Sequence, residues 1–396
     1  MLSLGMPYWS LSTTILYVLM GIIPMWTLYN KQYKNNYKGN NSRLLLWFLI
    51  WTIFGGYRVV GYGMGGADAG AYVLYFQNCL NPQSLMSGAM SQYDSNIGFR
   101  WFNHFLRFFS ADERFYLVVT SAIIAAVPII FIKYFRQSRE SCIPFFLCVF
   151  WFIRGFCTIR SHLSICAFML AVILLLKKKK NWAILLGAFS VLLHPMGAIY
   201  FPLLVLLYIK EDFSINMRKV ILLILSLFLV VAPMKQLFLQ NIDIFGDYSS
   251  HYEWYASSSN ENFFSNAWKI AFEQLLLLLC MYVNRNNLHK YMSILDGNAK
   301  RSFLFIYNVC IYDFLLIPFC YALNIWRGYE VCYIPRLIMW AIIVYIGATK
   351  LSKNFKWIYL MVVSLMFLGW FIQRTYAESF WLETGLMPYA FAPLMN

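Results

Sequence analysis

Long apolar segments alternate with short polar ones along almost the entire chain. Windows of about 20 residues, the length of a bilayer-crossing helix, detect twelve apolar segments. They are residues 11–28, 44–60, 115–132, 142–157, 162–176, 182–194, 196–209, 219–234, 267–283, 302–323, 333–349 and 356–372. Backbone groups in lipid must bond within their own helix. The pattern therefore predicts an all-α, polytopic integral membrane protein of about 12 transmembrane helices, in a single multi-pass domain over residues 1–396.

A histidine and a proline interrupt one of these stretches. Residues 182–209 are apolar on both sides of His194-Pro195, and proline removes a backbone donor and breaks a helix. Two arrangements remain open: one long helix broken at this point, or a re-entrant pair.

Basic residues lie mostly between alternate segments. If residues 31–43 are cytoplasmic, about two thirds of the 32 Lys and Arg residues lie on that side, as the excess of positive charge in cytoplasmic loops requires. Both termini are then expected on the periplasmic or extracellular face. The first charged residue is Lys31, so residues 11–28 are expected to be a retained span and not a cleaved signal.

The composition excludes a soluble domain of this length, because 61% of the 396 residues are hydrophobic and only 12% are charged. The net charge of +15 follows from the loop asymmetry and from contact with anionic lipid. We therefore expect membrane lipid as a partner and no nucleic acid. The nine cysteines form no Cys-x-x-Cys pair, which is typical of small buried apolar residues rather than of disulfides or a zinc site.

Two long segments on the expected outer face are residues 61–114 and 235–266. Within the first, apolar residues recur at three- and four-residue spacing over 98–110, with Arg100, His104 and Arg107 on the other side. This spacing predicts a short amphipathic helix on the outer leaflet. Its basic side either reaches a lipid-linked phosphate or serves only as an interfacial anchor.

The most unusual stretch runs from Arg58 to Phe76. An arginine ends an apolar run, and five glycines, Asp68 and spaced aromatics including Tyr72 follow. Glycine lets the backbone approach a ligand closely, and ionised side chains near hydrocarbon are costly and usually functional. The stretch is typical of the wall of a site. A salt bridge that orients Arg58 is the alternative role for Asp68.

Arginines and histidines gather at the expected outer ends of later segments. Arg160 and His162 open one segment, His194 ends another, and Arg327 and Arg336 precede or open a third. A guanidinium binds phosphate through a two-point fork, and histidine exchanges a proton near neutral pH. The alternatives are arginines that snorkel to headgroups and a His194 that is hydrogen-bonded within a helix bundle.

The segment 235–266 is acidic and aromatic. From Asp243 to Glu261 it has no Lys or Arg and includes Tyr248 and Trp254. Aromatic rings with carboxylates and amides suit sugar rings and their hydroxyls. An aromatic belt at the membrane surface explains the same composition equally well.

An acidic pair, Asp112-Glu113, stands before the segment 115–132. Paired carboxylates occur in many membrane glycosyltransferases, but a capping box with Ser110 as N-cap and Glu113 three residues on explains the pair better. The chain has no Walker A sequence, no His-Glu-x-x-His and no Asp-x-Asp. Gly61, Gly63 and Gly66 follow a membrane span rather than a strand, which argues against a dinucleotide site. We expect no cofactor and no metal.

Several of these residues, in this order, resemble a known family. Arg58, Gly66-Ala67-Asp68, Tyr72 and Phe76, Gly98-Phe99, Ile159-Arg160, Leu193-His194-Pro195 and Met387-Pro388-Tyr389 are similar to the EpsG branch of the Wzy-type polymerases of O-antigen, capsule and exopolysaccharide. The resemblance covers nearly the whole chain. The sequence departs from the family pattern at Asn96, where an acidic residue is frequent, and at Ser161, where glutamine is frequent.

The resemblance implies a polymerase at the outer face of the bacterial inner membrane. Such an enzyme joins oligosaccharide repeat units carried on undecaprenyl pyrophosphate, so its donor is not a nucleotide sugar. Cations must hold the departing pyrophosphate, and a base must take the proton of the attacking hydroxyl. The resemblance leaves open a chain-length regulator as a further partner, and it does not give the sugar.

Each site residue has an expected role on this interpretation. We expect Arg160 and Arg327, with Arg58 or Arg336, to bind pyrophosphate, and Asp68 or His194 to be the base. Tyr72, His162, Tyr248, Trp254 and Tyr389 are candidates for substrate contacts. Two alternative functions are a lipid-linked oligosaccharide flippase and a polyprenyl-phosphate-sugar transferase or O-antigen ligase, the transferase using Asp112 and Glu113.

Overall fold

The computed structural model describes residues 11–29, 41–60, 65–66, 68–80, 96–137, 139–208, 263–322 and 326–380. These residues form helices joined by turns, which confirms the all-helical prediction for this part of the chain. Five described helical segments are long and apolar enough to cross a membrane: Leu11–Leu28, Glu113–Phe135, Ile159–Leu176, Glu330–Thr349 and Lys353–Thr375. The chain is thus a helical membrane protein. The count of twelve spans stays a prediction, and the segment 219–234 lies outside the described residues.

The chain divides into two compact units. Unit 1 consists of Met1–His194 and Val344–Asn396, and unit 2 is Pro195–Ile343. The prediction of a single domain over residues 1–396 stays a prediction.

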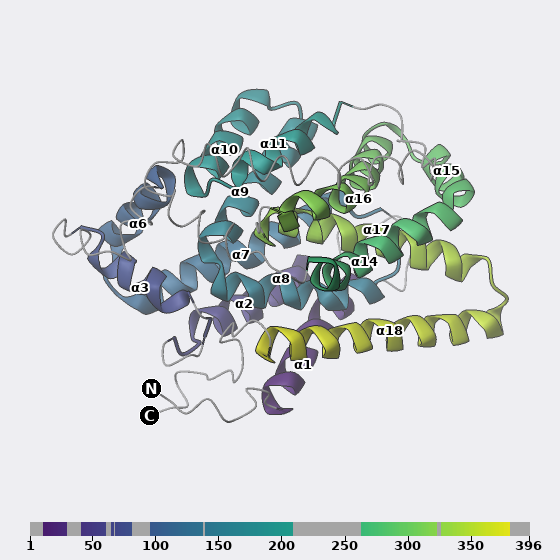
Figure 1. The fold of residues 1–396 in the computed structure, drawn as a ribbon, viewed down its shortest axis with the longest axis horizontal. Helices are drawn as coiled ribbons and strands as arrows, with labels where there is room; N and C mark the ends of the chain where they lie inside the picture. Colours follow the sequence, from purple (N-terminus) through teal and green to yellow (C-terminus); the bar gives the residue numbers. More distant parts are fainter. Residues whose placement is uncertain are drawn as a thin grey trace. The chain divides into compact units, whose positions relative to one another are not determined.

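Unit 1 contains most of the described helices (Figure 1). They are α1 (Leu11–Leu28), α2 (Asn41–Gly56), α3 (Ala69–Asn78), α6 (Ile97–Phe109), α7 (Glu113–Phe135), η3 (Ile143–Leu147), α8 (Cys148–Cys157), α9 (Ile159–Leu176), α10 (Lys180–Leu193) and α18 (Lys353–Phe380). Helix α9 turns back into α10 through Lys177–Lys179, where Lys178 has a φ of 61°. The two helices form an antiparallel hairpin, and α2 packs on α7.

Unit 2 contains α11 (Gly197–Val205), α14 (Phe263–Val283), α15 (Arg285–Ser293), α16 (Gly297–Ala322), the 3-10 helix η5 (Trp326–Cys332) and the first part of α17 (Tyr333–Thr349). Helix α14 packs against α16, and α16 packs against η5. Because α10 ends at Leu193 and α11 begins at Gly197, the predicted interruption at His194-Pro195 is confirmed.

Both of the expected outer segments contain helical residues. The segment 61–114 contains two helices, the predicted amphipathic helix α6 and the unexpected helix α3. With only ten residues, α3 is too short to be detected by hydropathy. Helix α14 begins at Phe263, within the segment predicted as 235–266. The rest of that segment lies outside the described residues.

Helix α6 exposes a row of aromatic side chains. Trp101, Phe105 and Phe108 are exposed, whereas Phe99 and Leu106 are buried against the protein. Phe99 and Leu106 are among the apolar residues over 98–110 whose spacing predicted a face on the outer leaflet. Their burial corrects that prediction, because spacing defines an apolar face without saying what covers it. The exposed row suits a helix lying in the interfacial region of a membrane.

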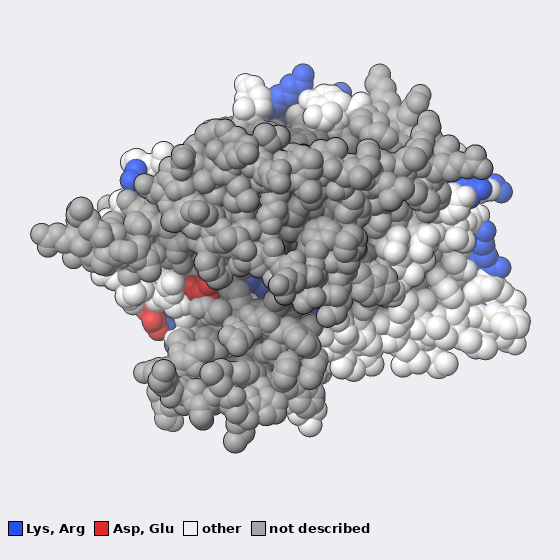
Figure 2. All heavy atoms as spheres, viewed as in Figure 1, with Lys and Arg blue, Asp and Glu red and all other residues white. Residues whose placement is uncertain are grey.

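The described surface is largely uncharged on the face drawn in Figure 2, where most of the described atoms belong to neither basic nor acidic residues. Helix α18 illustrates the consequence: only 17% of its candidate span is buried, and Trp357, Met361 and Leu365 are exposed on it. Such a surface is compatible with hydrocarbon and not with water.

Candidate functional site

Gly65 and Gly66 follow α2, and Gly66 lies against the end of α8. Gly65 and Gly66 have φ angles of 75° and 109°, a region that L side chains rarely adopt. A Cβ on Gly66 would lie 2.6 Å from the carbonyl oxygen of Phe156 and 2.9 Å from the backbone nitrogen of Cys157. The turn that leads to Asp68 is therefore fixed beside the turn that leads to Arg160.

Arg58 holds this turn from inside the protein. Its side chain is buried; Nε donates to the carbonyl of Gly65 at 2.9 Å, and Nη1 donates to the carbonyl of Gly55 and, at 3.3 Å, to the hydroxyl of Ser121. The guanidinium also lies 4.3 Å from the ring centre of Phe156. These contacts fix the backbone around the glycine turn, and pyrophosphate binding by Arg58 stays a prediction.

Asp68 is the N-cap residue of α3. Its carbonyl accepts the backbone N–H of Tyr72 at 3.1 Å, and its side chain makes no capping hydrogen bond. The side chain is half-buried, beside the positive end of the helix dipole. One turn later the buried ring of Tyr72 meets the ring of Phe99 edge to face, with 5.8 Å between ring centres. Tyr72 thus anchors the helix that begins at Asp68.

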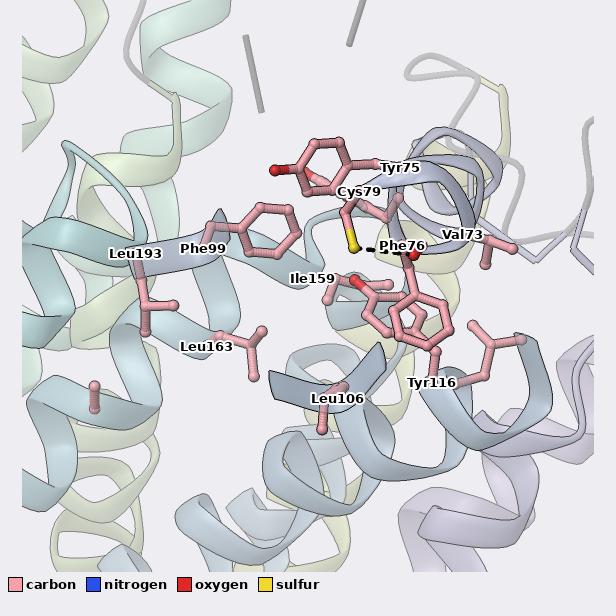
Figure 3. Packing of buried hydrophobic residues seen from close by; sticks show 13 residues of the cluster. Val73, Tyr75, Phe76, Cys79, Phe99, Leu106, Tyr116, Ile159, Leu163 and Leu193 are labelled. Atoms are coloured by element: carbon pink, nitrogen blue, oxygen red, sulfur yellow. Dashed lines mark hydrogen bonds between the residues drawn. The ribbon is translucent and has the colours of Figure 1, made fainter. Parts of the chain in front are cut away.

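One apolar cluster joins α3, α6, α7, α9 and α10 (Figure 3). It contains Tyr72, Phe99, Ile159 and Leu193, together with Tyr75, Phe76, Tyr116 and Leu163 among others. Ile159 immediately precedes Arg160, and Leu193 immediately precedes His194. The same packed cluster therefore supports the helix ends that carry Asp68, Arg160 and His194.

Gly98 sets the distance between α6 and the end of α10. A Cβ at this position would lie 2.7 Å from the carbonyl carbon of Leu192. The neighbouring ring of Phe99 stacks on Tyr75 at 5.7 Å between ring centres. The Gly-Phe step consequently lets α6 lie against the turn of α10 that ends in His194.

Arg160 lies in the first turn of α9. Its side chain is buried, and Thr158 is the N-cap residue. The first N–H groups of a helix have no partner within it and create a partial positive charge. A guanidinium at this end opposes the helix dipole, whereas an anion placed beside both would be stabilised by both.

His162 packs inside unit 1. Its Nδ1 lies 2.8 Å from the hydroxyl of Thr158, and its ring lies 4.4 Å from that of Trp151, measured between centres. Only 1% of the residue is exposed. This position gives His162 a packing role at the start of α9, and the substrate contact expected of it stays a prediction.

His194 ends α10 at the level of Arg160. Its backbone N–H donates to the carbonyl of Ser190 at 3.2 Å, and Ser190 contacts Ser164 of α9. Arg160 precedes Ser164 by one helical turn, and His194 follows Ser190 by one turn. Because the two helices are antiparallel neighbours, the N-terminal end of α9 and the C-terminal end of α10 lie at the same end of the hairpin. Arg160 and His194 therefore lie at the same end of the α9–α10 hairpin.

In unit 2, Arg336 is enclosed by two carboxylates. Its Nη1 lies 3.1 Å from Oε2 of Glu273 on α14, and its Nε lies 2.9 Å from Oδ2 of Asp313 on α16. All three side chains are buried. The arrangement joins α14, α16 and α17, and it neutralises the charge of Arg336 within the protein. Pyrophosphate binding by Arg336 stays a prediction.

The remaining candidates have no described side chain. Arg327 lies in η5, but its side chain is outside the described residues, as are Tyr248, Trp254 and Tyr389. Their expected roles stay predictions.

The acidic pair Asp112-Glu113 lies at the start of α7, as the predicted helix cap requires, but the capping residue differs from the predicted one. The N-cap is Asp112, whose carboxylate accepts the backbone N–H of Arg114 at 2.9 Å. Ser110, the expected cap, instead accepts the backbone N–H of Asp112 at 3.0 Å. The capping box was assigned two residues too early, because serine and aspartate are both good caps.

The sequence interpretation missed Ser164 and Ser190. Each is buried and stands four residues from a predicted site residue, toward the middle of its helix. That spacing was available as a signal, since residues four apart share a helix face. It was overlooked because single serines are common in membrane helices.

Comparison with known proteins identifies the family of the chain. No curated protein and no solved structure matches the chain. Residues 40–391 match the EpsG family, a Wzy-type polymerase-like family, and this match covers all three helix ends of the candidate site. The chain therefore belongs to the EpsG family.

Proposed function

We propose that the protein is a polysaccharide polymerase that joins undecaprenyl-pyrophosphate-linked oligosaccharide repeat units at the outer face of the bacterial inner membrane. Membership of the EpsG family supports a polymerase-like glycosyltransferase of polysaccharide biosynthesis. The observation that carries the proposal is that Asp68, Arg160 and His194 each stand at a helix end, within one turn of a residue of one apolar cluster. A cation, a carboxylate and an imidazole are the groups that this reaction needs.

The reaction moves the growing chain onto the incoming unit. A sugar hydroxyl of the incoming unit attacks the anomeric carbon of the chain, a new glycosidic bond forms, and the bond from that carbon to undecaprenyl pyrophosphate breaks. The electron pair leaves with the pyrophosphate, and the hydroxyl proton passes to a base. Arg160 and the start of α9 stabilise the leaving pyrophosphate.

His194 is the better base of the two candidates. A neutral imidazole can stand beside pyrophosphate without repulsion, and the imidazolium that forms is then attracted by the leaving group. A carboxylate in the same place would repel the pyrophosphate. We assign Asp68 to hydrogen bonds with the hydroxyls of the acceptor sugar, at the N-terminus of α3.

Two of the alternative functions are less well supported. A transferase using Asp112 needs that carboxylate for chemistry, but it already accepts a backbone N–H of α7. A flippase would present unpaired charges through the depth of the membrane. Within the α9–α10 hairpin, Arg160 and His194 lie at one end and Lys177–Lys180 at the other, and the buried charges Glu273, Asp313 and Arg336 of unit 2 are paired with one another.

Polysaccharide length in cells tests the proposal. A deletion strain would be complemented with wild type, Arg160→Ala, His194→Ala or Asp68→Asn, and surface glycan would be separated on gels with protein levels measured. We expect single repeat units from the deletion strain, ladders from wild type, and short or absent ladders from the variants. The control is His289→Ala, an exposed histidine of α15, which should keep full ladders.

Other outcomes would contradict specific parts of the proposal. Loss of all surface glycan with repeat units trapped inside the cell would indicate a flippase. Full ladders from Arg160→Ala and His194→Ala would refute the site assignment.

A further inference from the structure

Two buried serines bind each other across the α9–α10 hairpin. The hydroxyl of Ser164 donates to the carbonyl of Ser190 at 2.7 Å, and the hydroxyl of Ser190 donates to the carbonyl of Ser164 at 2.8 Å. The two hydroxyl oxygens lie 3.0 Å apart, and neither residue is more than 1% exposed. Each helix thus donates a side-chain hydrogen bond to the backbone of the other.

The two bonds are not equivalent with respect to the candidate site. The carbonyl of Ser190 accepts the Ser164 hydroxyl and also the backbone N–H of His194 at 3.2 Å. This is the hydrogen bond that ends α10, since His194 itself has an extended backbone with φ −156° and ψ 132°. The carbonyl of Ser164, by contrast, points toward the C-terminal end of α9 and Lys177, away from Arg160.

We propose that Ser164 is a positioning residue for His194. Its hydroxyl fixes the carbonyl of Ser190, which accepts the backbone N–H of His194, and so keeps His194 at a fixed distance from Arg160. This inference rests on the proposed function, in which His194 takes a proton while Arg160 binds pyrophosphate. Hydrogen bonds between helices in a membrane are modest individually. Their effect on rate is larger where they fix reacting groups, because small displacements of such groups slow a reaction strongly.

The structure supplies a matched pair of variants. Ser164→Ala removes the bond to the carbonyl that carries His194. Ser190→Ala removes one buried hydroxyl from the same contact but leaves that bond in place. Thr120→Val is a further control, because the Thr120 hydroxyl is buried in α7 and bonds to the carbonyls of Tyr116 and Leu117 in its own helix.

The experiment measures initial rates of polymerisation by purified protein in vesicles. The substrate is the lipid-linked repeat unit extracted from the deletion strain, varied in concentration, with thermal unfolding recorded for each variant. We expect Ser164→Ala to lower kcat about tenfold with little change in KM, and Ser190→Ala to lower it much less at a similar Tm. Thr120→Val should keep the wild-type rate.

A double-mutant cycle tests whether the effect passes through His194. Adding Ser164→Ala to His194→Gln should cause no further loss of rate, because the group that Ser164 positions is already absent. Equal losses in Ser164→Ala and Ser190→Ala, or an undiminished loss in the His194→Gln background, would overturn the positioning role. In either case the proposed function stands if Arg160→Ala and His194→Gln are strongly slowed but retain the measurable residual rate that the cycle uses. A fully active His194→Gln would instead refute the proposed base.

Discussion

At the scale of single residues, Gly66 has little freedom to change. Its φ of 109° strains any side chain, and a Cβ would meet backbone atoms of Phe156 and Cys157 rather than a flexible side chain that could move. The same turn is held by the Arg58 guanidinium. Two independent constraints therefore fix the backbone that leads to Asp68.

Gly66→Ala should destabilise the protein and reduce polymer length. A strained φ alone costs about 1–3 kcal/mol, and the backbone overlap adds to it. The measurement is thermal unfolding in detergent together with glycan length in cells. Gly369→Ala in α18 is the control, because apart from its own stretch of helix no described atom lies within 4 Å of that Cβ position. This variant should unfold at or slightly above the wild-type temperature. A wild-type Tm for Gly66→Ala would contradict the described turn.

What the sequence could predict differs between these residues. The need for glycine was visible in the five glycines after Arg58, because glycine adopts a positive φ far more readily than other residues. The partners of Arg58 were not visible, since Ser121 and Phe156 lie far away in sequence and come close only through the packing of α2, α7 and α8. Arg160 and His194 could be identified as polar residues at helix ends, but their shared level depends on the register of the hairpin.

At the scale of elements, the buried charges of unit 2 lock three helices together. Glu273, Asp313 and Arg336 come from α14, α16 and α17, and none is more than 7% exposed at its side chain. Charges this deep are stable only when they are paired. The helices are therefore held in one register by the geometry of a single guanidinium.

Arg336→Ala should destabilise the protein by about 3–5 kcal/mol, because it leaves two carboxylates buried without their cation. The neutral triple variant Arg336→Met, Glu273→Gln, Asp313→Asn should recover most of that loss in a thermal unfolding measurement. The triple variant also separates the two roles of Arg336. If it folds and polymerises, Arg336 is structural; if it folds and makes only single repeat units, Arg336 binds pyrophosphate as the sequence predicted.

Another buried carboxylate, outside the Arg336 group, makes stability depend on pH. Glu140, in the connection after α7, forms an ion pair with Arg136. Burial raises its pKa from 4.5 to about 8, with Arg136 opposing the rise. The folded state thus binds this proton more tightly than the unfolded state. The resulting stabilisation is complete below about pH 4.5 and is lost as the pH rises through 8.

The Tm in detergent should accordingly fall by several degrees between pH 5 and pH 8, and Glu140→Gln should flatten that part of the curve, because glutamine has no proton to lose. Asp112→Asn, at the exposed cap of α7, is the comparison and should leave the slope unchanged. A Tm that rises over this range in wild type, with the rise abolished by Glu140→Gln, would show that the ion pair dominates over burial.

Prediction of the elements worked best for long apolar segments. The boundaries of α1 and α17 coincide with the predicted 11–28 and 333–349, because apolar runs of this length between polar residues leave few alternatives. Helix α3 was missed, and the buried face of α6 was assigned to lipid. Both errors have one cause: a short helix is defined by the neighbours it packs on, and hydropathy does not contain them.

At the scale of the whole molecule, the orientation in the membrane is the main prediction. Helix α9 separates Arg160 from Lys177–Lys180, and α7 separates Ala111 from Lys133. The proposed function requires the Arg160 end outside, where lipid-linked repeat units meet the polymerase. The positive-inside rule favours the same orientation.

Cysteine labelling in intact cells tests this orientation. Ala111→Cys, exposed just before α7, should react with a membrane-impermeant maleimide, and Lys178→Cys should react only after the cells are opened. The background is low, since the eight described cysteines are free thiols and six of them are buried. The opposite labelling pattern would place the candidate site in the cytoplasm and exclude the proposed function.

The shared cluster behind the site has a consequence for genetic screens. Tyr72, Ile159 and Leu193 each stand within one turn of a residue assigned to chemistry, and all three belong to the same packed interior. A collection of random mutants selected for missing polymer will therefore recover interior positions alongside reactive ones, and the phenotype will not separate them. Measuring the unfolding temperature of each mutant protein would separate the two classes, because loss of a reactive group leaves the packed interior intact.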